Sequence, residues 1–130
     1  MKEMIVDVAV IGAGTAGLAA YRAAIAGGKS AVIIEGGPYG TTCARVGCMP
    51  SKVLVEAANA FHARTKLETY GIPGADGLAV DLPAVLRRVR ALRDHFVAGV
   101  LEATADLGER NLAGRATLLD ANTVQVGDRV

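Results

Sequence analysis

Residues 8–20, VAVIGAGTAGLAA, decide the fold of this chain. The stretch continues an apolar run at residues 5–11 that is rich in β-branched side chains and broken only by Asp7. A glycine-rich turn follows, and then a segment of small residues with helical character. We predict a buried strand at residues 5–11, a turn at 12–17 and a helix at 18–26 that ends at Gly27 and Gly28. A second strand follows at residues 30–34. This order predicts a right-handed βαβ unit and a parallel sheet.

The turn carries three glycines, Gly12, Gly14 and Gly17, in the spacing GxGxxG. The first glycine permits the tight turn, the second lets backbone approach a pyrophosphate, and the third lets the helix lie close to the strand. Backbone N–H groups at the start of the helix then face the anion. Glu35 follows at the end of the second strand, where such folds place an acid that binds ribose hydroxyls. Because strand, helix and acid all flank the glycines, we interpret them as a dinucleotide site rather than a turn without function; the pattern alone does not separate NAD from FAD.

The remainder of the chain alternates helices and turns before a β-rich end. We predict a loop at residues 36–42, a helix at 51–69 and a turn-rich linker at 70–77. A second helix at residues 83–106 and two strands joined by a turn at 111–130 follow. Four arginines of the second helix are expected to form a solvated face: Arg87, Arg88, Arg90 and Arg93. The predicted class is α/β, a Rossmann-like domain with long helices and a C-terminal β hairpin or meander.

Length and composition exclude several classes of function. The 130 residues suit one domain, and 52% hydrophobic residues are enough for a core. A net charge of +1 argues against nucleic-acid or membrane-surface binding driven by electrostatics. The chain has no apolar run near the ~20 residues that span a bilayer, and its N-terminus does not resemble a secretory signal. Two cysteines are too few for a disulfide scaffold, so we expect a reducing, cytoplasmic setting.

Both cysteines, Cys43 and Cys48, lie close together in GTTCARVGCMPSK, and three interpretations compete for them. They could be buried thiols that act as small hydrophobic groups. A zinc site would need about four ligands, and His62 and His95 lie in no metal-binding motif, so no metal is expected. A redox-active dithiol is favoured because Cys48 directly precedes a predicted helix, whose N-terminus stabilises a thiolate. A reversible disulfide needs an electron donor beside it, and a flavin serves this role better than a nicotinamide.

The stretch at residues 40–52, together with VAVIGAGTAG at residues 8–17 and Glu35, resembles the N-terminus of the pyridine nucleotide–disulfide oxidoreductases. The resemblance covers essentially the whole chain and is strongest to the dihydrolipoyl dehydrogenase branch, whose usual motif is GGTCLNVGCIPSK. Pro-Ser-Lys at residues 50–52 favours dihydrolipoyl dehydrogenase or mercuric reductase over glutathione reductase. Thr41 departs from the pattern, since many members have a second glycine there. We expect this change to adjust the loop near the pyrophosphate without abolishing binding.

The resemblance implies roles for three residues at the dithiol. Cys48 would be the charge-transfer thiolate against the flavin, Cys43 the thiol that exchanges with substrate, and Lys52 a cation near flavin N5. Dihydrolipoamide would reduce the Cys43–Cys48 disulfide, and electrons would pass to FAD and then to NAD as co-substrate. Mercuric or glutathione-type reductases run the flow in the opposite direction. An alternative of another class is a dinucleotide-binding module whose dithiol senses redox state without turnover.

The candidate cofactor-binding residues lie in the glycine turn, the loop after the second strand, the cysteine motif and one later segment. They are Gly12, Gly14, Thr15, Ala16, Gly17, Glu35, Gly36, Gly40, Thr41, Thr42, Cys43, Gly47, Cys48, Lys52, Gly114 and Ala116. By resemblance, Thr42 would contact the pyrophosphate. Gly114 and Ala116 would contact the adenine end of FAD, with a plain strand as the alternative.

By the same resemblance, residues 1–130 would be the N-terminal portion of a single FAD-binding domain. Its nicotinamide and dimerisation domains, and an acid–base pair contributed by a partner subunit, would belong to a longer parent protein. We therefore expect no lipoamide turnover from this chain alone. The parent is expected to be a homodimer, to act on dihydrolipoamide or another small disulfide or dithiol, and to serve in a 2-oxoacid dehydrogenase complex, with no nucleic-acid or membrane partner.

Overall fold

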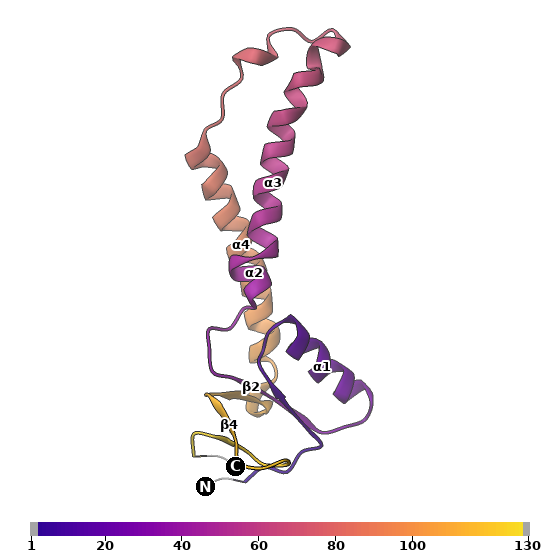
Figure 1. Cartoon of the computed structure of the whole chain (residues 1–130), viewed down its shortest axis with the longest axis vertical. Helices are drawn as coiled ribbons and strands as arrows, with labels where there is room; N and C mark the ends of the chain where they lie inside the picture. The colour runs from indigo at the N-terminus through magenta and orange to yellow at the C-terminus, as the bar shows by residue number, and fades with distance from the viewer. Residues whose placement is uncertain (1–2, 129–130) are drawn as a thin grey trace. The chain divides into compact units, whose positions relative to one another are not determined.

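The computed structural model describes residues 3–128, and these form an α/β structure with a parallel sheet (Figure 1). The chain divides into two units. We call Met1–Thr42 with Val97–Val130 the sheet unit and Cys43–Phe96 the helical unit. Among the described residues, no helix combines the length and the hydropathy required to cross a bilayer.

The sheet unit contains the predicted βαβ arrangement. Strands β1 (Val8–Ile11), β2 (Ala31–Glu35) and β3 (Asn111–Ala113) form a parallel sheet in the order β1-β2-β3, and helix α1 (Thr15–Ala26) connects the first two. This confirms the predicted parallel sheet. Strand β1 is shorter than the predicted 5–11 because its pairing with β2 begins only at Val8 opposite Ala31.

One face of the sheet is covered by α1. Its core consists of Val10, Ala13, Leu18, Tyr21, Ala31 and Ile33. Val100 and Leu107, at and just beyond the C-terminal part of helix α4 (Leu82–Ala105), pack against the same cluster. Helix α1 begins three residues earlier than predicted because Gly14, in extended conformation, serves as its N-cap.

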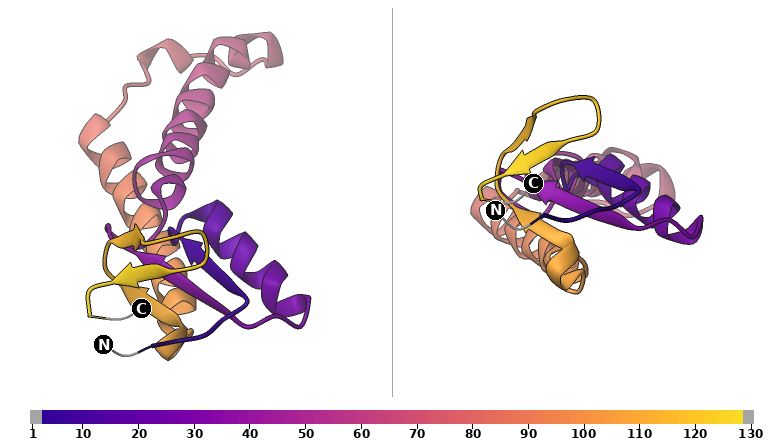
Figure 2. Two further views of the ribbon diagram at one scale, coloured as in Figure 1. Left: turned by 60° about the horizontal axis from the view of Figure 1, so that its bottom comes forward. Right: turned by 90° about the horizontal axis from the view of Figure 1, so that it is seen from below.

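The C-terminal segment forms three strands rather than the predicted two. After the short 3-10 helix η3 (Gly108–Arg110) and β3, Gly114 has a φ of +146°, and this backbone conformation separates β3 from β4 (Ala116–Leu118). Strand β4 pairs antiparallel with β5 (Val124–Val126), so the predicted hairpin is present (Figure 2). Its turn is closed at Asp120, whose carboxylate accepts the N–H of Asn122 at 2.8 Å.

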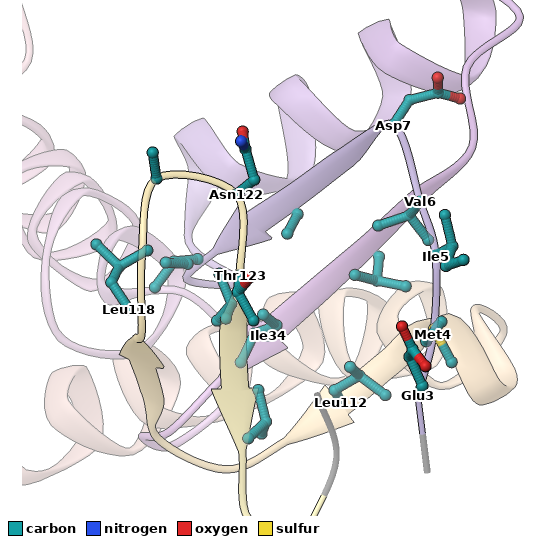
Figure 3. A pocket seen from close by; sticks show the side chains of 16 residues that line it. Glu3, Met4, Ile5, Val6, Asp7, Ile34, Leu112, Leu118, Asn122 and Thr123 are labelled. Atoms are coloured by element: carbon teal, nitrogen blue, oxygen red, sulfur yellow. The ribbon is translucent and has the colours of Figure 1, made fainter.

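The hairpin lies over the second face of the sheet, opposite α1 (Figure 3). Val32, Ile34, Leu112 and Val126 form a second buried cluster there. Beside it, a hollow of about 490 Å³ opens between the hairpin and the N-terminal segment 3–7. Ile11 lines this hollow and is 56% exposed. The second face of the sheet is therefore only partly covered.

The helical unit contains α3 (Cys48–His62) and the first part of α4, which diverge toward the segment that connects them (Figure 1). Helix α2 (Thr42–Val46) precedes α3 and was not predicted, because five residues are too few to show helical periodicity. The predicted helix at 51–69 is in fact α3 followed by the 3-10 helix η1 (Ala63–Tyr70). It begins earlier because Pro50 is tolerated in the first turn, where its missing N–H is not needed. The linker contains the 3-10 helix η2 (Ala75–Gly77).

Truncating Ile33 should destabilise the sheet unit far more than truncating Ile11. Ile33 is 0% exposed in the core between sheet and α1, and buried Ile→Ala changes cost about 2–5 kcal/mol. We expect Ile33→Ala to fall in this range, and Ile11→Ala on the adjacent strand to cost about 1 kcal/mol or less. Urea unfolding followed by circular dichroism measures both, and equal losses would contradict the assignment of the two faces.

Candidate functional site

The glycine turn has the geometry that a close approach to a ligand requires. Gly12 has a φ of +102°, and its N–H donates to the carbonyl oxygen of Ile34 at 2.7 Å. A Cβ at Gly17 would lie 1.8 Å from the carbonyl oxygen of Gly12, so no side chain fits there. In contrast, a Cβ at Gly12 or Gly14 would meet nothing within 4 Å. The turn is thus closed on the helix side and open on the outer side.

The N-terminus of α1 faces this open side with unused donors. No side chain caps the helix at Gly14, and the first intrahelical bond of this turn runs from the N–H of Leu18 to the carbonyl of Gly14 at 2.9 Å. The N–H groups of Thr15, Ala16 and Gly17 precede that bond, in the first turn, where helices have no internal acceptor for them. Such groups and the helix dipole together suit an anion such as a pyrophosphate.

Glu35 is held by backbone on both of its oxygens. Its Oε2 accepts the N–H of Ala13 at 2.7 Å, and its Oε1 accepts the N–H of Gly37 at 2.7 Å. The carboxylate therefore fixes the glycine turn to the end of β2, a structural role that the sequence did not reveal. A carboxylate oxygen accepts more than one hydrogen bond, so capacity for ribose hydroxyls remains at the predicted position.

Two other predicted residues, Gly36 and Gly114, meet at the same edge of the sheet. The N–H of Gly114 donates to the carbonyl oxygen of Glu35 at 2.9 Å. A Cβ at Gly36 would lie 3.0 Å from the Cα of Arg115, so the two backbones pass close to each other. Ala116 is different, because its side chain packs against the buried cluster beneath the hairpin.

Tyr39 anchors the loop after β2, and the sequence analysis did not single it out. Its hydroxyl donates to Oδ1 of Asn111 at 2.8 Å, and the Asn111 amide donates in turn to the carbonyl oxygen of Thr104 at 3.4 Å. Desolvation raises the pKa of Tyr39. The only signal in the sequence is an aromatic residue within a glycine-rich loop, which does not identify its partner.

Thr41, the departure noted in the sequence, occupies a backbone conformation that suits glycine. Its φ is +57°, and among residues 3–128 it is the one non-glycine residue with positive φ. A left-handed conformation costs an L-residue roughly 1–2 kcal/mol. Gly40 before it also has a positive φ, of +100°. This backbone conformation therefore gives a physical reason for the glycine that many members of the family named in the sequence analysis carry at this position.

The helical unit brings the two cysteines together. Cys43 lies in α2 and is half-buried, whereas Cys48 is the first residue of α3 and is exposed; both are free thiols. Hydrogen bonding to the Cys48 thiol is the largest cause that raises the pKa of Cys43, and desolvation adds to it. The positive charge of Lys52 acts in the opposite direction on Cys43. The two thiols are therefore close enough to influence each other, and Lys52 lies one helical turn after Cys48.

The predicted site residues thus form two sets, one in each unit. The set in the sheet unit consists of Gly12, Gly14, Thr15, Ala16, Gly17, Glu35, Gly36, Gly40, Thr41, Thr42, Gly114 and Ala116. The set in the helical unit consists of Cys43, Gly47, Cys48 and Lys52, with Gly47 as the N-cap of α3. Within residues 3–128, no group of three or more His, Cys, Asp or Glu residues is placed to hold a metal ion.

Replacing Glu35 with Gln should loosen the glycine turn. A glutamine amide can accept at its oxygen, but its nitrogen would face a backbone N–H, so Ala13 or Gly37 loses its acceptor. We expect a loss of about 1–3 kcal/mol in the free energy of unfolding. Glu102→Gln on the exposed surface of α4 is the matched control, with an expected change within about 0.5 kcal/mol. Equal effects of the two changes in urea unfolding would refute the turn-fixing role.

Replacing Cys48 with Ala should shift the pH dependence of alkylation at Cys43. A raised pKa leaves less Cys43 thiolate at neutral pH, and only the thiolate is alkylated. Removing the Cys48 thiol removes the largest cause that raises the pKa of Cys43. Its pKa should therefore fall, and the pH profile of iodoacetamide modification at Cys43, followed by mass spectrometry, should shift to lower pH. A shift to higher pH would show that the hydrogen bond does not favour the protonated form.

The sequence profile of the family "Pyridine nucleotide-disulphide oxidoreductase" matches residues 6–128. A dihydrolipoyl dehydrogenase of Trypanosoma brucei brucei is 33% identical over 126 residues, covering 92% of this chain and 26% of that protein. A mercuric reductase of Streptomyces lividans is 35% identical over 121 residues, with 92% and 26% covered.

A solved structure shares the fold. It is the Cu(II) complex of the HOCl-induced flavoprotein disulfide reductase RclA from Escherichia coli, with a TM-score of 0.65 at 20% identity. The match covers 95% of this chain and 24% of that one. The chain thus spans about a quarter of the length of the proteins it matches.

Proposed function

Since the chain belongs to the pyridine nucleotide-disulphide oxidoreductase family, we propose that it is the FAD-binding, dithiol-bearing portion of a flavoprotein disulfide oxidoreductase. One observation carries this proposal. Cys43 in α2 and Cys48 at the start of α3 lie close enough for the Cys48 thiol to act on Cys43, with Lys52 one turn further along α3, in a chain that also carries the glycine turn. Neither a zinc site nor a pair of inert core thiols accounts for an exposed Cys48 at a helix N-terminus.

The residues of the sheet unit fit a dinucleotide such as FAD. The space in front of Gly12 and Gly14 is open, and the uncapped start of α1 offers N–H donors to its pyrophosphate. Glu35 retains acceptor capacity for its adenosine ribose. When bound, FAD supplies a two-electron acceptor that can pass electrons on to a nicotinamide.

The chain's own residues perform the thiol chemistry. A substrate thiolate attacks the sulfur of Cys43 in the oxidised pair, the Cys43–Cys48 bond breaks, and Cys48 leaves as a thiolate. The second substrate thiol then attacks the substrate sulfur bound to Cys43 and releases the Cys43 thiol. The substrate loses two electrons as its disulfide forms, and the cysteine pair gains them. The N-terminus of α3 and the charge of Lys52 favour the anionic state of the pair.

For the longer protein, we propose transfer of electrons from dihydrolipoamide to NAD. The support is the Pro-Ser-Lys sequence at residues 50–52 and the 33% identity to a dihydrolipoyl dehydrogenase. Nicotinamide-binding and dimerisation domains, and membership of a 2-oxoacid dehydrogenase complex, are part of the same proposal. We propose a cytoplasmic location because two cysteines are too few for a disulfide scaffold.

Mercuric reductase is the second candidate for the longer protein. The 35% identity to the mercuric reductase from Streptomyces lividans supports this candidate as strongly as the 33% identity to a dihydrolipoyl dehydrogenase supports the first. Electrons would then flow from a nicotinamide through FAD to the cysteine pair, in the reverse direction. Assays of the longer protein with dihydrolipoamide, glutathione disulfide and Hg²⁺ distinguish these candidates, because only the true substrate should support rapid turnover.

The test on this chain is a titration with FAD followed by reduction with two electrons. We expect a yellow complex that gains a long-wavelength charge-transfer band when the dithiol forms. Cys48→Ser should abolish this band because the thiolate against the flavin is lost. Cys43→Ser is the matched control and should retain it.

The opposite result for the two variants would exchange the roles of Cys43 and Cys48. A colourless protein that binds NAD but not FAD would overturn the flavoprotein proposal. That outcome would favour a dinucleotide-binding module with a redox-sensing dithiol.

A further inference from the structure

A groove lies between α3 and α4 within the helical unit. Its volume is about 400 Å³, which falls within the range of small-molecule sites. The floor is apolar and consists of Met49, Val53, Ala57, Ala60 and Phe96. Three charged residues complete the lining: Lys52, Glu56 and Arg88. The groove therefore suits a ligand with an apolar body and a polar end.

Two residues that line the groove, Met49 and Lys52, lie within four residues of Cys48 along α3. Met49 follows Cys48 directly, and Lys52 lies four residues after Cys48 on the same face of α3. The charge of Lys52 also acts on the Cys43 thiol. From Lys52 to Ala60 the groove follows α3 for roughly 12 Å, at about 1.5 Å per residue. A molecule whose sulfur meets Cys43 can thus extend its chain along this floor.

Arg88 differs from the other arginines of α4. The sequence predicted a solvated face for all four. Arg87, Arg88 and Arg90 are exposed, whereas Arg93 is half-buried and its guanidinium lies 2.7 Å from the carboxylate of Asp94. Arg88 alone of the four lines the groove, and it forms no ion pair with any residue in the range 3–128. Two cations against the single carboxylate of Glu56 leave the groove with a net positive charge. A guanidinium next to apolar surface is well suited to bind a carboxylate.

We propose that this groove is the substrate subsite of the dithiol, and that Arg88 binds an anionic group at the far end of a small aliphatic dithiol or disulfide. This rests on the proposed exchange chemistry at Cys43. Arg88 is then a specificity-determining residue, because it distinguishes a carboxylate from a neutral amide at the end of otherwise identical molecules. The substrate dithiol is oxidised to its disulfide while the Cys43–Cys48 disulfide is reduced to two thiols.

The test uses the chain oxidised to its disulfide, with dihydrolipoate and dihydrolipoamide as probes. The two differ only in the carboxylate or amide end group. We measure the rate at which each reduces the Cys43–Cys48 pair, by rapid acid quench and thiol counting. One partly exposed ion pair contributes up to about 1 kcal/mol, so dihydrolipoate should react about 3- to 5-fold faster.

Substitutions at position 88 should change this ratio. Arg88→Gln should bring it to about one, Arg88→Glu should invert it, and Arg88→Lys should keep part of the preference. Arg87→Gln removes a neighbouring arginine that does not line the groove, so it should leave the ratio unchanged. Circular dichroism checks that each variant keeps its helices.

The outcomes separate this inference from the proposed function. Reduction at equal rates by both probes, or an Arg88→Gln variant that retains the full preference, overturns the role of Arg88 and leaves the exchange chemistry intact. Failure of both probes to reduce the disulfide overturns the exchange chemistry and the subsite together.

Discussion

The sheet unit depends on a contact that leaves no room for a side chain. The Cβ of any residue other than glycine at position 17 would collide with the carbonyl oxygen of Gly12. Because this space is empty, α1 can start directly against the turn, and Leu18 and Tyr21 reach the core of the sheet. The same close approach directs the first N–H groups of α1 outward. Packing of the core and the capacity to bind an anion therefore have one geometric cause.

The sequence predicted the parts of the fold that local signals encode. Glycine spacing and apolar runs identified β1, α1 and β2, and helical periodicity identified α3 and α4 with shifted ends. The break between β3 and β4 was missed because it depends on pairing of β3 with β2 and on Gly114, far along the chain. The contact of Tyr39 with Asn111 likewise joins residues 72 positions apart, which no local pattern reveals.

The candidate site was predictable to a similar degree. The motif identified Cys43, Cys48 and Lys52, since the chemistry requires those residue types in that order. It did not reveal that Glu35 fixes the turn through two backbone N–H groups, because a strand-end acid has many possible partners. Nor did it distinguish Arg88 from its neighbours. Periodicity shows which residues share a helix face, but not which face meets another helix.

The composition of the strands makes the second face of the sheet apolar as well as the first. The sequence VAVI in β1 is apolar on both faces, as in strands that are covered on both sides. In the sheet unit, α1 packs on one face together with Val100 and Leu107, whereas the β4–β5 hairpin covers the other only in part and leaves Ile11 exposed beside a hollow. Burial of apolar surface there would stabilise the structure by about 25 cal/mol for each Å² removed from water. Further packing against the exposed part of this face would therefore lower the free energy of the folded state.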